Sequence, residues 1–387
     1  MVLSSDRSAE TPELSDARLP YLPGLDGLRA LAVLGVLLYH AGLGLQGGFL
    51  GVETFFVLSG FLITSLLLAE WRQDGRVDIV RFWRRRARRL LPALILLLAG
   101  TWAFTLLALP EEAAELRDDT LAALGYVMNW RLVFSGRSYF DPLVRPPLLQ
   151  HLWSLAVEEQ FYLLWPPLFA AGMRYLRRAG LLLATLAGAA ASAALMAALY
   201  DPGADPSRIY YGTDTRAAGL LLGASLALVW APGHIPAAAS RRVGLALDAA
   251  GLAALAALLA AYAWLFEQHP LLYQGGFGLV AIATAVAVAA ATHPQAQLLE
   301  RLLGWRPLRW VGVRSYGIYL WHWPVFMVTR PEEDVPLDGL PLLALRFAAA
   351  LGLAALSYRL VELPVRRGAL ARCWASLRAT AEEYLRP

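Results

Sequence analysis

GLDGLRALAVLGVLLYH, residues 24–40, is an apolar stretch that carries three ionisable side chains, Asp26, Arg29 and His40. On a helix turning about 100° per residue, Arg29 and His40 fall within about 20° of one face. They lie about 16 Å apart along the axis, roughly half a bilayer core. Ionisable groups in a membrane helix usually face a bundle interior or a wet cavity, so we expect this face to line a site. The alternative is that Asp26 and Arg29 anchor the helix end and His40 only packs.

The composition is that of a polytopic membrane protein. Of 387 residues, 58% are hydrophobic and 17% charged, and apolar runs long enough to cross a bilayer recur throughout. All 34 basic residues are arginine, and their concentration in a few loops indicates membrane topology rather than nucleic-acid binding. The single cysteine, Cys373, excludes an intrachain disulfide and a cysteine-based metal site, and we expect no metal cofactor.

Ten apolar segments are each long enough to span a bilayer, some with tilt. They cover residues 26–44, 49–69, 90–109, 152–171, 181–199, 215–231, 244–265, 275–292, 311–328 and 340–360. If the N-terminus is inside, the regions on that side hold 24 of the 34 arginines, which places both termini in the cytoplasm. The expected fold is therefore all-α, a polytopic membrane helix bundle of about ten transmembrane helices.

One further apolar segment, residues 120–135, is short and contains Asn129 and Arg131. If it spanned the membrane, the arginine-rich C-terminal region would lie outside. We therefore interpret it as a re-entrant or surface helix over the outer end of the bundle. The loop 110–151 that contains it is long, and such loops are often functional lids.

Five arginines lie within six residues at the start of the third span. They are Arg84, Arg85, Arg86, Arg88 and Arg89. Guanidinium groups bind phosphates bidentately and a helix N-terminus adds partial positive charge, so the cluster is a candidate anion site. Such clusters also fix topology and bind anionic lipids, and charge alone does not separate the two interpretations.

A second polar cluster opens the fourth span in HLWSLAVEEQFY, residues 151–162. On a helix His151, Glu158 and Tyr162 share one face, with Ser154 one turn before Glu158. Two adjacent carboxylates at this depth need a partner or a cavity, and one of them can orient an imidazole or a substrate hydroxyl. The alternative is an acid pair stabilised by the helix dipole.

Three more motifs follow: YYGTDTR at residues 210–216, SYGIYLWHWP at residues 315–324, and Glu362-Leu-Pro364. Asp214 and Arg216 either pair with each other or support a site. His322 is a second imidazole within an apolar segment, where packing around a proline kink is the alternative. Glu362 indicates a structural clasp more than a catalytic group.

Together these motifs resemble the bacterial membrane acyltransferase family 3 over about residues 21–367. They occur in the family's order: Arg-x10-His in the first helix, GGFLGVETFFVLSGFL (47–62), Arg-x-x-Arg, WSLAVEEQFY (153–162), Asp-Thr-Arg, SYGIYLWHWP and Glu-x-Pro. The resemblance implies a ten-helix O-acyltransferase of the bacterial cytoplasmic membrane, which transfers an acyl group, usually acetyl, from acyl-CoA to a hydroxyl. Family acceptors are mostly envelope sugars, including peptidoglycan, and in some actinomycetes macrolide antibiotics.

The resemblance also implies roles for individual residues. The catalytic histidine maps onto His40, the acid onto Glu158, and Arg29 marks the inner end of the donor path. The arginine pair that binds acyl-CoA maps onto Arg86 and Arg89, with Arg85 and Arg88 in the alternative registers. The acceptor-binding or supporting residues are Asp26, Glu53, Ser154, Gln160, Tyr162, Asp214, Arg216, Tyr319 and His322. His40 acts as general base or as transient nucleophile.

The expected organisation is a disordered cytoplasmic tail at residues 1–22, the membrane domain at 23–365, and an arginine-rich cytoplasmic tail at 366–387. Many relatives carry an SGNH-hydrolase domain after the tenth helix, which we do not find in this sequence, and Asp where this chain has Glu53. We expect the membrane domain to act alone or with a separate extracytoplasmic partner. Its expected partners are the bilayer, acyl-CoA and a carbohydrate or glycoside acceptor.

Two other classes of function compete with an enzyme. A transporter or flippase of a glycan or an acylated intermediate suits ten helices with buried charges. Against it, the sequence shows no inverted repeat and no paired broken helices. A sensor or scaffold leaves the arginine cluster and His40 without a joint purpose.

Overall fold

The computed structural model describes residues 19–140, 145–230, 241–331 and 333–369, and these residues are helical apart from loops and one isolated bridge between Pro331 and Val335. The elements are α1 (Pro23–His40), η1 (Gly48–Leu50), α2 (Gly51–Asp74), α3 (Ile79–Ala108), η2 (Pro110–Glu112), α4 (Ala113–Leu124), α5 (Met128–Phe134), α6 (Leu152–Tyr175), α7 (Arg177–Leu199), α8 (Ser207–Tyr211), α9 (Thr213–Val229), α10 (Arg241–Trp264), η3 (Leu272–Gly276), α11 (Phe277–Ala291), α12 (Gln297–Leu303), α13 (Arg306–Val313), α14 (Ser315–Met327), α15 (Gly339–Ser357), η4 (Tyr358–Glu362) and α16 (Leu363–Arg366). The predicted all-α membrane bundle is confirmed. Most of the predicted tails, residues 1–18 and 370–387, lie outside the described residues.

Each of the ten predicted spans falls largely on helix. Within the part of the chain that the structure describes, six helical stretches are long and apolar enough to cross a membrane by length and composition alone. They are Gly48–Asp74, Ile79–Ala108, Arg177–Leu199, Arg241–Trp264, Leu272–Ala291 and Gly339–Arg366. The other four predicted spans correspond to α1, α6, α9 and α14, which are short or carry charged residues.

The burial of the helices explains this difference. Most of α1, α9 and α14 is buried, whereas α7, α10 and α15 bury only a minority of their residues. A helix that is apolar all round and little buried by protein is suited to face lipid. The central helices are screened by the outer ones and so tolerate the polar side chains from which the site is built.

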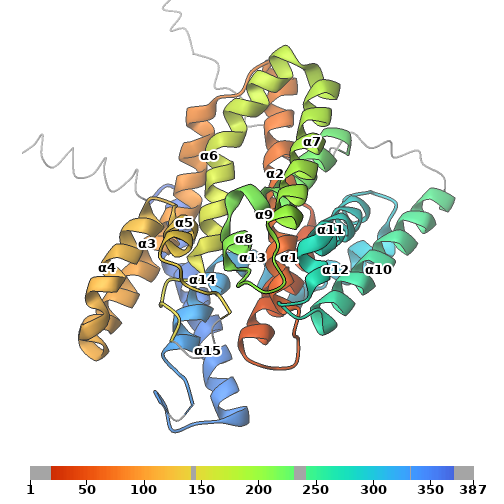
Figure 1. Cartoon of the computed structure of the whole chain (residues 1–387). Helices are drawn as coiled ribbons and strands as arrows, with labels where there is room; N and C mark the ends of the chain where they lie inside the picture. The colour runs from red at the N-terminus through yellow and green to blue at the C-terminus, as the bar shows by residue number, and fades with distance from the viewer. Residues whose placement is uncertain (1–18, 141–144, 231–240, 332, 370–387) are drawn as a thin grey trace, which may run out of the picture.

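The bundle has two chemically different ends (Figure 1). At the arginine end, α2 finishes and α3 begins with its cluster of guanidinium groups, in the upper half of the view. At the far end, α1 finishes at His40, and the loops that follow α3 and α14 lie in the lower half. The α1 helix stops at His40 rather than running to residue 44 as predicted, so this imidazole lies at the end of its helix.

Residues 120–135 do not form a span. The segment is divided between α4 and α5, helices of 12 and 7 residues, both too short to cross a bilayer. The amide of Asn129 on α5 donates to the Thr213 hydroxyl at 2.9 Å, and Gln160 of α6 donates to the Asn129 side-chain oxygen at 3.0 Å. These amides tie α5, α6 and α9 together, which gives Gln160 a structural role.

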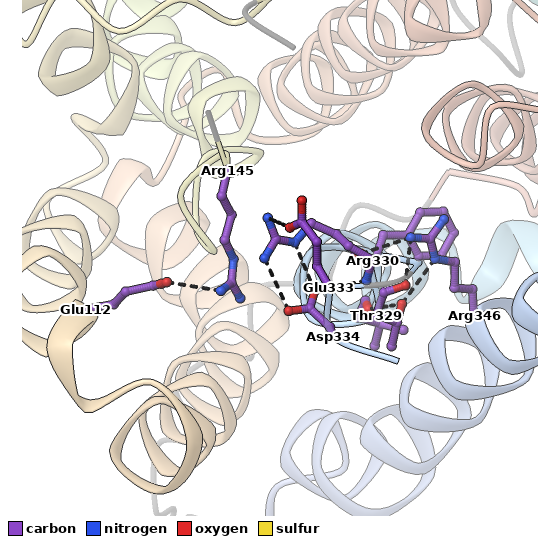
Figure 2. A network of polar contacts seen from close by, with 9 residues as sticks. Glu112, Arg145, Thr329, Arg330, Glu333, Asp334 and Arg346 are labelled. Carbon is purple, nitrogen blue, oxygen red and sulfur yellow. Dashed lines mark hydrogen bonds and ion pairs between the residues drawn. The ribbon is translucent and has the colours of Figure 1, made fainter. Parts of the chain in front are cut away.

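Polar contacts also hold the loops of the far end, as Figure 2 shows. Glu112 pairs with Arg145 at 3.0 Å, and Arg330 pairs with Asp334 at 2.9 Å. The buried Arg346 of α15 donates to the carbonyl oxygen of Thr329 at 2.9 Å and to that of Phe326 at 3.3 Å, just where α14 ends. Arg346 thereby satisfies carbonyl groups that the helix end leaves free.

Close packing of α2 against α9 depends on glycine. A Cβ atom placed on Gly60 of α2 would lie 1.9 Å from the Leu220 carbonyl oxygen, and one on Gly223 of α9 would lie 2.0 Å from that of Val57. The two backbones therefore touch, as small residues permit in membrane bundles.

We predict that Gly223→Ala destabilises the protein, although alanine favours helix formation by about 1 kcal/mol over glycine. The added methyl group forces α2 and α9 apart and lowers the melting temperature in detergent by several degrees. The control is Gly352→Ala in α15, where a Cβ would meet no atom within 4 Å. Equal melting temperatures for the two variants would contradict this account of the packing.

Candidate active site

A cavity lies among α1, α2, α3, α6 and α14. Towards the arginine end it is lined by Arg29 of α1 and by Arg86 and Arg89 of α3. At its other limit it is lined by Ser154 of α6 and Tyr319 of α14. The predicted site residues of four helices thus meet in one space, with cationic groups concentrated in one part of it.

Of the five clustered arginines, two face this cavity. Arg86 and Arg89 are three residues apart and so share a helix face. Arg85 instead pairs with Glu70 at 3.2 Å, and Arg84 and Arg88 are exposed. This places the pair Arg86 and Arg89, rather than Arg85 and Arg88, beside the cavity.

The cavity wall combines an arginine, a tyrosine and a carboxylate. The guanidinium carbon of Arg86 lies 4.1 Å from the centre of the Tyr162 ring, a cation–π contact. The Tyr162 hydroxyl donates to Glu158, and so does the hydroxyl of Ser59 on α2. The Nε atom of Arg86 is buried and has no hydrogen-bond partner among the described residues, so a donor remains available to an anionic ligand.

A hydrogen bond joins two residues that line the cavity at its limit towards the far end. The Ser154 and Tyr319 hydroxyl oxygens lie 2.7 Å apart. The Tyr319 hydroxyl also donates to the carbonyl oxygen of His151 at 2.9 Å. His151 precedes Ser154 by three residues and His322 follows Tyr319 by three, so both imidazoles lie one helical turn beyond this hydrogen bond, about 5 Å along each helix.

His40 meets His322 beyond the Ser154–Tyr319 hydrogen bond. The Nδ1 atom of His40 lies 3.1 Å from Nε2 of His322, and the two rings stack at 5.2 Å between centres. The Nε2 atom of His40 lies 3.2 Å from the hydroxyl of Tyr139, in the loop after α5. Both nitrogens of His40 are therefore in polar contact, one with each side of the site.

The backbone defines which nitrogen carries each proton. Nδ1 of His322 lies 2.6 Å from the carbonyl oxygen of Tyr319, a contact that requires an N–H on Nδ1. In neutral His322, Nε2 then carries only a lone pair and must accept from Nδ1–H of His40. Neutral His40 is left with its lone pair on Nε2, where the Tyr139 hydroxyl donates to it. Burial raises the pKa of Tyr139 well above its usual range, so this hydroxyl keeps its proton.

Glu158 does not contact His40, contrary to one role predicted for it. Its partners are Ser59 and Tyr162, because it lies seven residues along α6 from His151, about 10 Å closer to the arginine end. The group that orients His40 is the imidazole of His322 instead.

The predicted alternative that Asp214 pairs with Arg216 is wrong. Asp214 lies at the start of α9 and pairs with Arg208 of α8 at 2.8 Å. Arg216 turns inward and pairs with Glu53 of α2 at 2.9 Å, with exposed side-chain fractions of 1% and 2%. The centre of the Phe277 ring is 4.0 Å from the Arg216 guanidinium carbon. The pair connects α2 with α9, and removing one partner of such a pair typically costs about 3–5 kcal/mol, because the other charge is left buried and unpaired.

Two other predicted residues lie away from the histidines. Asp26 accepts from the Tyr21 hydroxyl at 2.7 Å, at the opposite end of α1 from His40. Glu362 accepts from Arg366 at 3.1 Å within the last helical segment, as a clasp would.

Sequence reasoning missed Tyr139. The residue is in a loop, where no helical period relates it to His40, and its role depends on how the loop folds back over α1. His151 was singled out as part of its motif but not as a neighbour of His322, from which it is 5.8 Å away between ring centres.

Comparisons with known proteins agree with the motifs. The model of a family described as an acyltransferase domain matches residues 22–359. A peptidoglycan O-acetyltransferase, OatA, from Listeria monocytogenes is 42% identical over 349 residues, 90% of this chain and 56% of the relative. The putative peptidoglycan O-acetyltransferase YrhL of Bacillus subtilis is 42% identical, over 89% of this chain and 55% of the relative.

The O-acetyltransferase OatA of Staphylococcus aureus is 38% identical, over 90% of this chain and 57% of the relative. The chain thus spans somewhat more than half the length of the curated relatives it matches. No solved structure is a significant match.

Proposed function

Because the chain belongs to the membrane acyltransferase family whose domain model spans most of it, we propose that it transfers an acetyl group from acyl-CoA to a hydroxyl of a cell-wall glycan. The observation that carries the proposal is the order of groups along the bundle: arginines, a cavity, then the His40–His322 pair. The named relatives are peptidoglycan O-acetyltransferases, which supports a peptidoglycan-type acceptor.

The arginines suit the donor. Coenzyme A carries several phosphate charges, and guanidinium groups bind phosphate oxygens in a bidentate fashion. One part of the cavity is lined by Arg29, Arg86 and Arg89. The buried Nε–H group of Arg86 has no hydrogen-bond partner among the described residues. The arginine-rich side of a membrane protein is usually cytoplasmic, where acyl-CoA is made, so we assign the arginine end to the cytoplasm.

The chemistry at His40 follows from its tautomer. Nε2 of His40 takes the proton of the acceptor hydroxyl as the oxygen attacks the thioester carbonyl carbon. The carbon–sulfur bond then breaks, the new ester remains on the acceptor, and the coenzyme A thiolate receives the proton from His40. Nε2 is also the nitrogen that would attack the thioester if an acyl-imidazole formed first.

His322 acts through His40. His322 accepts the Nδ1–H of His40 and thereby keeps the lone pair of His40 on its Nε2 atom. This lone pair points towards the Tyr139 hydroxyl. As Nε2 gains a proton, this hydrogen bond also favours the developing positive charge. His322 is therefore a positioning residue.

Ser154 and Tyr319 line the limit of the cavity nearest the histidines, and we infer that their hydrogen bond separates the cavity from His40. An acyl group entering from the arginine end reaches His40 only when that hydrogen bond opens. The closed state keeps water and the thioester apart from the imidazole until an acceptor is present, which suits an enzyme that avoids hydrolysing its donor.

We predict that Arg86→Ala combined with Arg89→Ala weakens acetyl-CoA binding by tenfold or more, because two phosphate-binding groups are lost. Binding is measured by titrating acetyl-CoA into purified protein in detergent. Arg88→Ala is the matched control, since it removes an exposed arginine of the same cluster. If all these variants bind acetyl-CoA as the wild type does, the donor site lies elsewhere.

We predict that His40→Ala lowers acetyl transfer by about 10²–10⁴-fold, the usual contribution of a general base, with acetyl-CoA binding unchanged. His322→Ala lowers kcat by a smaller factor with little change in KM. His322→Gln recovers part of the rate, because its side-chain oxygen accepts the same proton. A His40→Ala protein with full activity, or no recovery in His322→Gln, contradicts the assigned roles.

A further inference from the structure

A second cleft lies at the far end of the bundle. It is formed by the segment after α5, the loop between α7 and α8, and the loop that follows α10. Its lining includes Ser138, Phe140, Tyr200, Pro202, Asp205 and Gln268. The described residues that line this cleft differ from those that line the arginine-lined cavity. They also lie outside the motifs and the site that were predicted from the sequence.

The lining combines aromatic rings with hydrogen-bonding groups. Tyr200 is held by Tyr273, whose ring stacks on it at 5.0 Å between centres and 5° between planes. Phe140 packs against Tyr210 at 5.2 Å. Rings fixed in this way offer flat apolar surfaces with little loss of conformational entropy on binding, as the C–H face of a sugar ring requires.

Asp205 supplies an ionised acceptor in the cleft. Its Oδ1 atom accepts from the backbone N–H of Ser207 at 2.7 Å, and its Oδ2 atom from the Ser138 hydroxyl. Partial burial raises the pKa of Asp205, but these hydrogen bonds outweigh burial and hold the pKa below its usual range. A carboxylate has about four lone-pair sites, so acceptors remain for sugar hydroxyls. Of the described lining residues none is basic, so the cleft suits an uncharged ligand better than a phosphate.

Three consecutive residues connect this cleft to the histidines. Ser138 and Phe140 line the cleft, whereas Tyr139 between them turns inward to Nε2 of His40 at 3.2 Å. The backbone N–H of Tyr139 donates to the Ser207 hydroxyl at 2.8 Å, which fixes this segment against α8. The Tyr139 hydroxyl thus holds the position beside the base that an acceptor hydroxyl requires for deprotonation.

We infer that this cleft binds an uncharged sugar residue of the acceptor glycan, and that a hydroxyl of the adjoining sugar displaces the Tyr139 hydroxyl at His40. The inference rests on the proposed function, since it names where the acceptor of that reaction is held. The donor then reaches His40 through the arginine-lined cavity, and the acceptor from the opposite end of the bundle.

The test uses an N-acetylglucosamine tetramer as the probe, titrated into purified full-length protein in detergent. We expect saturable binding to the wild type and binding at least tenfold weaker in Tyr200→Ala and in Gln268→Ala. Tyr200→Phe keeps the stacked ring and should bind within about threefold of the wild type. Because Tyr200 also packs on Tyr273, Gln268→Ala serves as an independent variant of an exposed side chain. Tyr175→Ala, at the end of α6, is the exposed-aromatic control.

Acetyl-CoA binding is measured on the same samples and should be unchanged in every variant. If the tetramer does not bind the wild type, or binds all variants equally while acetyl-CoA still binds, the cleft assignment is overturned and the proposed reaction stands. If the wild type binds no acetyl-CoA, the proposed reaction itself fails.

Discussion

Hydrocarbon does not solvate charge, and this constraint accounts for the arrangement of the central helices. Each ionisable side chain on them needs either a partner or a polar cavity. Arg216 and Glu53 form a buried ion pair, and Arg86 and Arg89 of α3 line a shared cavity. The outer helices contribute apolar surface and screen these groups from lipid. The buried ion pair joins α2 to α9, whereas Arg86 and Arg89 are left facing the cavity.

The histidine pair lies between two hollows of opposite character. The arginine-lined cavity is cationic and ends at the Ser154–Tyr319 hydrogen bond, whereas the far cleft offers rings and a carboxylate and ends at Tyr139. The Tyr139 side chain closes the approach to His40 from the far cleft, and the Ser154–Tyr319 hydrogen bond closes the approach from the arginine-lined cavity. A membrane enzyme that joins a charged donor to a neutral acceptor benefits from such separation, because each substrate is selected by its own chemistry before the two meet. The imidazole is reached by both substrates only when both closures open.

Periodicity along single helices predicted much of this arrangement. The apolar runs located the helices. The family resemblance, rather than periodicity, mapped the donor arginines onto Arg86 and Arg89, which line the cavity. Pairings between helices were not predictable in the same way, because they depend on how each helix is rotated against its neighbours. Asp214 and Arg216 are close in sequence at the start of α9, yet they point in different directions. Asp214 pairs with Arg208 of α8, and Arg216 pairs with Glu53 of α2. Tyr139 was missed for a related reason: a loop residue has no period, and only the folded loop brings it to His40.

We propose that donor and acceptor reach His40 from opposite ends of the bundle. To test this, purified protein is placed in sealed vesicles with radiolabelled acetyl-CoA enclosed inside and an impermeant glycan acceptor outside, with His40→Ala vesicles as the blank. We expect labelled glycan in the outer solution although the two substrates never share a compartment. Label transferred only when acetyl-CoA and acceptor are on the same side of the membrane would contradict it.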